Sequence, residues 1–111
     1  TLYKHTLMAT PNNYVIHNNL GFSLTARHRF EEAIAHFKAA LRINPDYEDA
    51  SINLGIALLS QRKIDQCIAY YQEILKKKPG YAGVQHNLGI VLLRNGKVEN
   101  AVFHFREALK I

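Results

Sequence analysis

The chain has 111 residues, of which 48% are hydrophobic and 21% are charged, and its formal net charge is +5. This composition excludes a disordered segment and fits one globular domain. The longest apolar runs are too short to cross a bilayer, and the single cysteine, Cys67, excludes an internal disulfide.

Residues 1–11 are predicted to be a helix that ends at Pro11, because proline lacks an amide donor and disfavours helix at the residue before it. Tyr3 and Leu7 lie 34 residues before Phe37 and Leu41. We therefore expect this helix to be the second of a pair whose first helix is missing, and the native chain to extend upstream of residue 1.

Three complete helical pairs are predicted next, from apolar residues that recur at three- and four-residue spacing. The predicted pairs are 14–26 with 30–43, 47–60 with 64–77, and 81–94 with 98 to the end. Asn12 or Asn13 is expected to cap the first of these helices and Asp46 the third, since their side chains can accept hydrogen bonds from free backbone amides.

An Asn-Leu-Gly tripeptide recurs at a fixed interval in the first helix of each pair. Its copies begin at Asn19, Asn53 and Asn87, 34 residues apart. Two apolar columns keep the same period: the aromatic column Tyr3, Phe37, Tyr71 and Phe105, and the leucine column Leu7, Leu41, Leu75 and Leu109. A period of this length is typical of stacked helical repeats.

The glycine of each tripeptide lies in the middle of a helix, where it costs about 1 kcal/mol relative to alanine. Three such costs predict a steric need. We expect each glycine to lie against a small side chain of the second helix, which lets the two helices approach closely. The expected pairs are Gly21 with Ala33, Gly55 with Cys67, and Gly89 with Ala101.

These columns resemble the tetratricopeptide repeat. In the first unit the matching residues are Leu20, Gly21, Leu24, Ala33, Phe37, Ala40 and Pro45. The resemblance covers essentially the whole chain and implies an all-α fold, a right-handed superhelical αα-repeat solenoid of antiparallel helix pairs. It implies one array over residues 1–111: helix B of a truncated repeat (1–11), repeat 1 (14–47), repeat 2 (48–81), and repeat 3 without its terminal proline (82–111).

The chain departs from the family pattern in two columns. The first usually holds an aromatic residue in the first helix, and the second usually holds glycine in the turn between the helices. The columns read His17, Ser51 and Gln85 for the aromatic position, and His28, Arg62 and Gly96 for the turn.

In this family the first helices of the repeats line an inner, concave face, so the resemblance implies a peptide-binding face here. Asn19, Asn53 and Asn87 are expected to bind peptide backbone, because a carboxamide both donates and accepts hydrogen bonds. The pattern resembles the asparagine ladders that hold peptides in the repeats of O-linked N-acetylglucosamine transferase. The alternative is that these amides hydrogen-bond within the array. The rest of the expected face is Phe22, Ile56 and Ile90 as an apolar strip, with Asn18, His86 and Arg94 beside it.

No catalytic, metal or cofactor site is predicted. The histidines show no zinc spacing, Cys67 has no partner cysteine, and the glycines form no phosphate-binding loop. The basic residues lack the interleaved aromatics of a nucleic-acid surface, so we expect no nucleic-acid partner. Asn18 and Asp49 stand where the chaperone-binding members of the family place cations, so we do not expect recognition of an acidic C-terminal tail.

The leading hypothesis is a non-catalytic scaffold that binds an extended peptide or a partner protein. One alternative is the repeat tail of a larger enzyme, such as a bacterial membrane glycosyltransferase, because residues 2–7, 10–13 and 17–21 resemble the start of such tails. Another is self-assembly into a homo-oligomer through the uncapped terminal helices, and Val102, Leu109 and Ile111 are expected to be exposed on the final one. We expect a cytoplasmic-type soluble domain that makes no membrane contact itself, with attachment to a membrane protein as the alternative.

Overall fold

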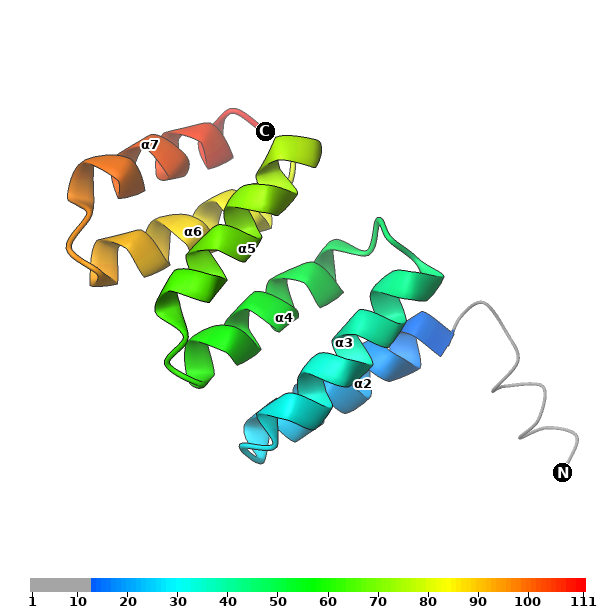
Figure 1. Cartoon of the computed structure of the whole chain (residues 1–111). Coiled ribbons are helices and arrows are strands. Elements are labelled where there is room, and N and C mark those ends of the chain that lie inside the picture. Colours follow the sequence, from blue (N-terminus) through cyan, green and yellow to red (C-terminus); the bar gives the residue numbers. More distant parts are fainter. Residues whose placement is uncertain (1–12) are drawn as a thin grey trace, which may run out of the picture. The chain divides into compact units, whose positions relative to one another are not determined.

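The computed structural model describes residues 13–111, and the regular structure in that part of the chain is α-helical, which confirms the predicted all-α class. The helices are α2 (Asn13–Ala26), α3 (Phe30–Ile43), α4 (Glu48–Ser60), α5 (Ile64–Lys77), α6 (Ala82–Arg94) and α7 (Val98–Leu109) (Figure 1). The predicted helix over residues 1–11, including its end at Pro11, and the alternative cap at Asn12 lie outside the described residues.

The observed helix boundaries differ little from the predicted ones. The helices α3 and α5 begin and end where they were predicted, and α2 begins one residue early, with Asn13 inside the helix rather than capping it. The helix α7 ends at Leu109, two residues before the end of the chain. Differences of one or two residues are usual at helix ends, which fray and tighten.

The predicted cap of α4 by the side chain of Asp46 stays a prediction. Tyr47 precedes the helix, and its carbonyl accepts a hydrogen bond of 3.4 Å from the amide of Ser51. The backbone amide of Asp46 donates to Oδ1 of Asn44 at 3.2 Å, which is an Asx turn. The asparagine two residues before Asp46 therefore organises this turn.

The chain divides into two compact units, and the division falls within α4, between Ala57 and Leu58. In the first unit α2 and α3 pack side by side as a helical hairpin (Figure 1). In the second unit α6 and α7 form the same kind of hairpin, and α5 packs against α6. The buried apolar side chains are Ala33, Phe37, Ala40, Ala50, Leu54 and Ala57 in the first unit, and Cys67, Tyr71, Val84, Leu88, Val91, Leu92 and Ala101 in the second.

The mid-helix glycines leave room for an aromatic ring. A Cβ atom added at Gly21 would lie 2.5 Å from the ring of Phe37, and one added at Gly89 would lie 2.7 Å from the ring of Phe105. Contacts this short do not occur in packed proteins. Each glycine therefore allows the first helix of its repeat to pack directly on the aromatic column of the second helix.

The prediction that Ala33 and Ala101 face these glycines stays a prediction, because the three atoms nearest to the added Cβ belong to the aromatic ring in both cases. Both alanines are fully buried, but the ring four residues further along the helix occupies the space beside the glycine. The corresponding prediction for Gly55 and Cys67 stays a prediction.

The connections between α2 and α3, between α4 and α5 and between α6 and α7 each contain one residue with a left-handed backbone. The angle φ is 62° at His28, 64° at Arg62 and 80° at Gly96. In all three turns the next amide donates to the carbonyl five residues earlier, at 2.8 to 3.0 Å, which closes the end of the first helix. Glycine adopts this conformation without steric cost, whereas His28 and Arg62 hold it under strain.

Candidate functional site

A buried asparagine joins α2 to α4 in the first unit. Asn18 is 7% exposed, and its Oδ1 accepts a hydrogen bond of 3.0 Å from Nδ2 of Asn53. The side chains of Asn18 and Tyr47 are also hydrogen-bonded, and burial followed by the Asp49 carboxylate raises the pKa of Tyr47. A buried amide without partners costs about 1–3 kcal/mol, so this network fixes how the two helices meet.

Three residues of the predicted face are exposed beside this link. Phe22 on α2 is 65% exposed, and Ile56 on α4 is 39% exposed. Phe22 follows Asn18 by four residues and Ile56 follows Asn53 by three, so each apolar side chain lies one helical turn beyond the bonded pair. Asn19 is exposed, and its side chain makes no hydrogen bond within residues 13–111.

The remaining predicted residues lie on α6 in the second unit. Asn87 is half-buried, and its side chain hydrogen-bonds the hydroxyl of Tyr71 on α5, a group whose pKa is raised by burial. His86 is exposed, and its ring lies 5.7 Å from an aromatic ring of α7. Ile90 is half-buried, and Arg94 is exposed in the last turn of the helix.

The three ladder asparagines are therefore not equivalent. Asn19 is exposed and its side chain makes no hydrogen bond to the part of the chain that the structure describes, whereas Asn53 and Asn87 are half-buried and each hydrogen-bonds a neighbouring helix. These two amides already have the structural role that was the alternative to peptide binding.

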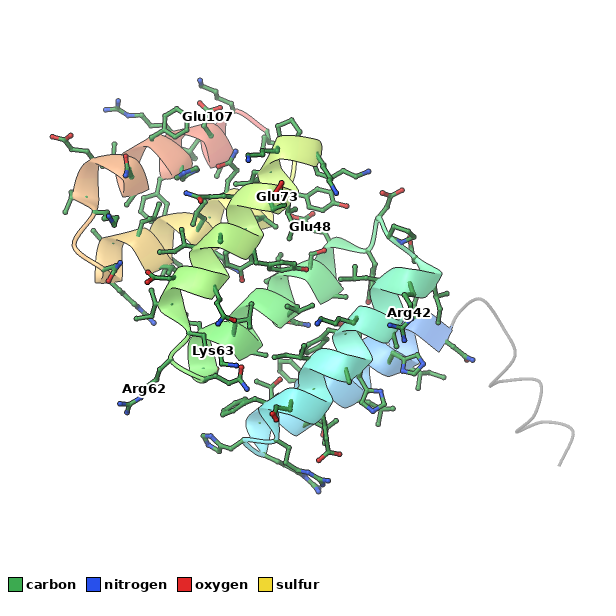
Figure 2. All side chains as sticks on the ribbon, in the orientation of Figure 1. Arg42, Glu48, Arg62, Lys63, Glu73 and Glu107 are labelled. Carbon is green, nitrogen blue, oxygen red and sulfur yellow. The ribbon has the colours of Figure 1, made fainter. Side chains whose placement is uncertain are left out.

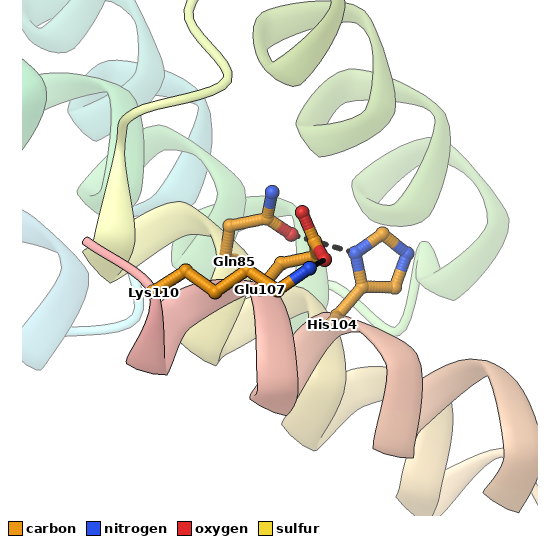
Figure 3. A network of polar contacts seen from close by, with 4 residues as sticks. All are labelled: Gln85, His104, Glu107 and Lys110. Carbon is orange, nitrogen blue, oxygen red and sulfur yellow. Dashed lines mark hydrogen bonds and ion pairs between the residues drawn. The ribbon is translucent and has the colours of Figure 1, made fainter.

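Sequence reasoning missed two polar pairs that each join the two helices of a hairpin. Nδ1 of His17 on α2 lies 3.0 Å from Nδ1 of His36 on α3. Nδ1 of His104 on α7 lies 2.7 Å from Oε1 of Gln85 on α6 (Figure 3). Both pairs are 19 residues apart and occupy the same two repeat columns. The sequence did contain a signal for these pairs. Polar residues replace the usual aromatic residue in the column of His17 and Gln85, and histidine recurs in the column of His36 and His104.

Burial lowers the pKa of both His17 and His104. The imidazole partner of His17 and the cation of Arg42 lower its pKa further. The carboxylate of Glu107 opposes the effect of burial on His104, and it is itself ion-paired with Lys110 at 2.7 Å (Figure 3). Both imidazoles are consequently more easily kept neutral than a solvated histidine.

The described residues contain no group of three histidine, cysteine, aspartate or glutamate side chains that could hold a metal ion. Cys67 is fully buried, and burial raises the pKa of its thiol to about 11, so at neutral pH it lacks the thiolate character that a nucleophile needs. From residue 13 onward, no helix is both long and apolar enough to traverse a lipid bilayer. Arg62, in the turn before α5, extends away from the helices (Figure 2).

Sequence comparison identifies two matches to the tetratricopeptide repeat. One profile of the repeat matches residues 24–86, which is more than half of the chain, and a second matches residues 82–111. No curated protein matches the sequence.

Several solved structures are similar to this one. A crystal structure of MamA superposes with a TM-score of 0.74 at 24% identity and covers 96% of this chain and 63% of the MamA chain. A second MamA structure gives a TM-score of 0.67 at 20% identity, with 96% and 62% covered. The type III secretion translocator chaperone SycD of Yersinia enterocolitica, in an alternative dimer, gives 0.75 at 17% identity, with 89% and 75% covered. The chain thus spans less than two thirds of the MamA chains, and these likenesses concern the fold.

Proposed function

The chain belongs to the tetratricopeptide repeat family, and from this we propose that it is a non-catalytic scaffold that binds an extended peptide or a partner protein. The proposed contact surfaces are the exposed faces of α2 and α4 in the first unit and of α6 in the second unit. SycD is described as a translocator chaperone, and that description supports a protein as the ligand class.

The observation that carries the proposal is the exposure of Phe22. A phenylalanine side chain that is 65% exposed leaves a large apolar area in water, and burying it stabilises a complex by about 1.5–3 kcal/mol. Aromatic anchors of this kind dominate the energetics of protein interfaces. Ile56 on α4 adds a second apolar contact.

Asn19 supplies the polar part of the contact on α2. Its exposed carboxamide can donate to a peptide carbonyl and accept from a peptide amide at the same time. Asn18 is instead part of the framework, because it is buried and bonded to Asn53. Of the two, only Asn19 can bind a ligand without breaking a hydrogen bond among residues 13–111.

On α6 the proposal assigns different roles to three residues. His86 and Arg94 are exposed and offer hydrogen-bond donors, and Ile90 is half-buried and offers an apolar contact. Arg94 also lies in the last turn of its helix, where a cation stabilises the negative end of the helix dipole. A ligand contact by Arg94 therefore calls for an acidic side chain on the partner.

The test begins with peptides selected by display against the 111-residue chain, whose affinities are then measured by fluorescence anisotropy. Phe22→Ala is expected to weaken the selected peptides about tenfold or more, which corresponds to about 1.4 kcal/mol. Asn19→Ala is expected to weaken them by a smaller factor, because one exposed hydrogen-bonding group contributes about 0.5–1.5 kcal/mol.

Phe103 provides the matched control, since it is 56% exposed but lies on α7, outside the proposed surfaces. Phe103→Ala should leave the affinity unchanged while removing a side chain of the same kind and exposure. Equal losses in the Phe22 and Phe103 variants would show non-specific stickiness, and no loss in Phe22→Ala would remove α2 from the binding surface. Circular dichroism checks that each variant remains folded.

Self-assembly is a second candidate, and one observation favours it. Leu109 is 87% exposed, whereas Leu41 and Leu75 in the same repeat column are half-buried. Val102 and Ile111 are 39% and 61% exposed, so the predicted exposure of the final helix is confirmed. An apolar helix face of this kind is suited to packing against another helix, including one from a second copy of the chain.

A further inference from the structure

The imidazole rings of His17 and His36 face each other across the α2–α3 hairpin. Their Nδ1 atoms are 3.0 Å apart, while the ring centroids are 5.2 Å apart and the ring planes are inclined by 32°. The centroids are thus farther apart than the two nitrogens by about a ring width, so the nitrogens point toward each other. This is the geometry of a hydrogen bond that places one proton between two imidazoles.

Such a contact has a fixed proton requirement. One Nδ1 must carry a hydrogen and the other must present its lone pair. A first additional proton can bind Nε2 of the donor ring, which leaves the hydrogen bond intact and makes its donor cationic, hence stronger. A second additional proton can only bind the accepting Nδ1, which removes the lone pair and leaves two cations in contact.

We propose that the His17–His36 pair is a pH-responsive clasp between α2 and α3, closed while it holds at most one additional proton and opened by the second. The proposal goes beyond partner binding and does not depend on it. It does bear on that function, because α2 also carries Asn19 and Phe22.

The other ionisable groups around the pair, among residues 13–111, reinforce this behaviour. The positive charge of Arg42 on α3 lowers the pKa of His17, so it opposes the uptake of a second proton by the pair. Glu32, one turn before His36 on α3, is bonded to Arg29, with its carboxylate 2.8 Å from the guanidinium Nε. On α2, the ring of Tyr14, one turn before His17, packs on that of Tyr47.

The direction of the pKa shift agrees with the geometry. Burial, His36 and Arg42 all lower the pKa of His17 from its ordinary 6.5, so the folded chain binds this proton less tightly than the unfolded chain. The stability that the neutral acceptor contributes is therefore complete above pH 6.5 and is lost as the pH falls through that value toward the lowered one.

The second hairpin contains a natural comparison. In the His104–Gln85 pair the acceptor is an amide oxygen, so His104 must donate through Nδ1 and can take its extra proton at Nε2 without losing the bond. The two hairpins thus hold related pairs in the same columns, of which only the histidine pair is broken by acid.

The test measures urea unfolding of the 111-residue chain at pH 7.5 and pH 5.0. Between these values the unfolding constant of the wild type should rise severalfold more than that of His17→Gln, because only the wild type loses the neutral acceptor of the imidazole pair. His17→Gln reproduces the amide–imidazole pair of the other hairpin and should remain folded at pH 7.5. Gln85→His installs a second imidazole pair and should add a comparable acid dependence.

An equal acid dependence in the wild type and His17→Gln would overturn the proposal. A second measurement uses the wild type alone, so it does not depend on the variants folding. Nuclear magnetic resonance titration of the imidazole ring signals should show the pair taking up two protons in separate steps, with His17 protonated below its ordinary pKa of 6.5. Two independent steps at the ordinary histidine pKa would equally overturn it.

Discussion

Nδ2 of Asn53 donates a hydrogen bond of 3.0 Å to Oδ1 of Asn18, although the two residues are 35 positions apart, one more than the repeat period. The bond links the first helices of two successive repeats through a side chain that is 7% exposed. Replacing Asn53 therefore disturbs the framework of the first unit as well as its surface. Phe22 and Asn19 are the cleaner positions at which to test partner binding.

The Asn18–Asn53 bond should be measurable as a coupling energy. Asn18→Ala is expected to lower the free energy of unfolding by about 1–3 kcal/mol, because it leaves the amide of Asn53 and the hydroxyl of Tyr47 without their partner. Asn53→Ala should cost about 0.5–1.5 kcal/mol, since Asn53 is only half-buried. In urea denaturation the double variant should lose at least about 0.5 kcal/mol less than the sum of the single variants. Strict additivity would show that the bond contributes nothing.

Gly21→Ala should destabilise the first unit even though alanine is the better helix former. The new Cβ would lie 2.5 Å from the ring of Phe37, which is fully buried and has no free volume to move into. Overpacking of this kind costs about 1–3 kcal/mol, and improved helix propensity offsets about 1 kcal/mol of it. Gly80→Ala is the control, because nothing lies within 4 Å of its added Cβ, and its stability should change by less than about 0.5 kcal/mol. A Gly21 variant as stable as the wild type in urea would contradict the packing described.

Arg62→Gly should stabilise the protein, which is unusual for a substitution to glycine. Arg62 has a φ of 64°, and a side chain in the left-handed region costs about 1–2 kcal/mol. The greater freedom of glycine in the unfolded chain offsets about 0.4–1 kcal/mol, so we expect a net gain of up to about 1 kcal/mol in thermal or urea unfolding. Gly96→Ala, in the equivalent turn with a φ of 80°, should change stability by a similar amount with the opposite sign. Equal signs for the two variants would refute the strain argument. His28→Gly is a weaker test, since it also removes an edge contact with the ring of Phe30.

The repeat period explains why the helices could be predicted closely from the sequence. Three copies of one pattern locate each helix three times. Pro45 and Pro79 separate the pairs, and the turn column separates the two helices of each pair. The differences from prediction were confined to helix ends, and the Asx turn at Asn44 before α4 was not predicted.

The neighbours of individual side chains were harder to predict, because a repeat column states which residues are equivalent and not which ones touch. Gly21 was matched with Ala33, and the sequence did not show that the ring of Phe37, four residues later, lies closest to it. The column of Asn19 was treated as one ladder, but Asn53 turns to Asn18 in the neighbouring column. Contacts between columns depend on the rotation of each helix about its axis, which a single sequence does not specify.

Self-association of the 111-residue chain should depend on the apolar face of α7. Leu109 is 87% exposed, and burying a leucine side chain stabilises an association by about 1.5–3 kcal/mol. Sedimentation velocity is expected to show an average mass that rises with concentration for the wild type and stays at the monomer value for Leu109→Glu, since a buried carboxylate would oppose the contact. Phe103→Glu is the matched control: it places the same charge on α7 at a residue that is 56% exposed but lies in a different repeat column. If Phe103→Glu abolishes association as fully as Leu109→Glu, then general hydrophobicity rather than the leucine column drives the association. A wild type that remains monomeric at all concentrations would rule out this face as a self-assembly surface.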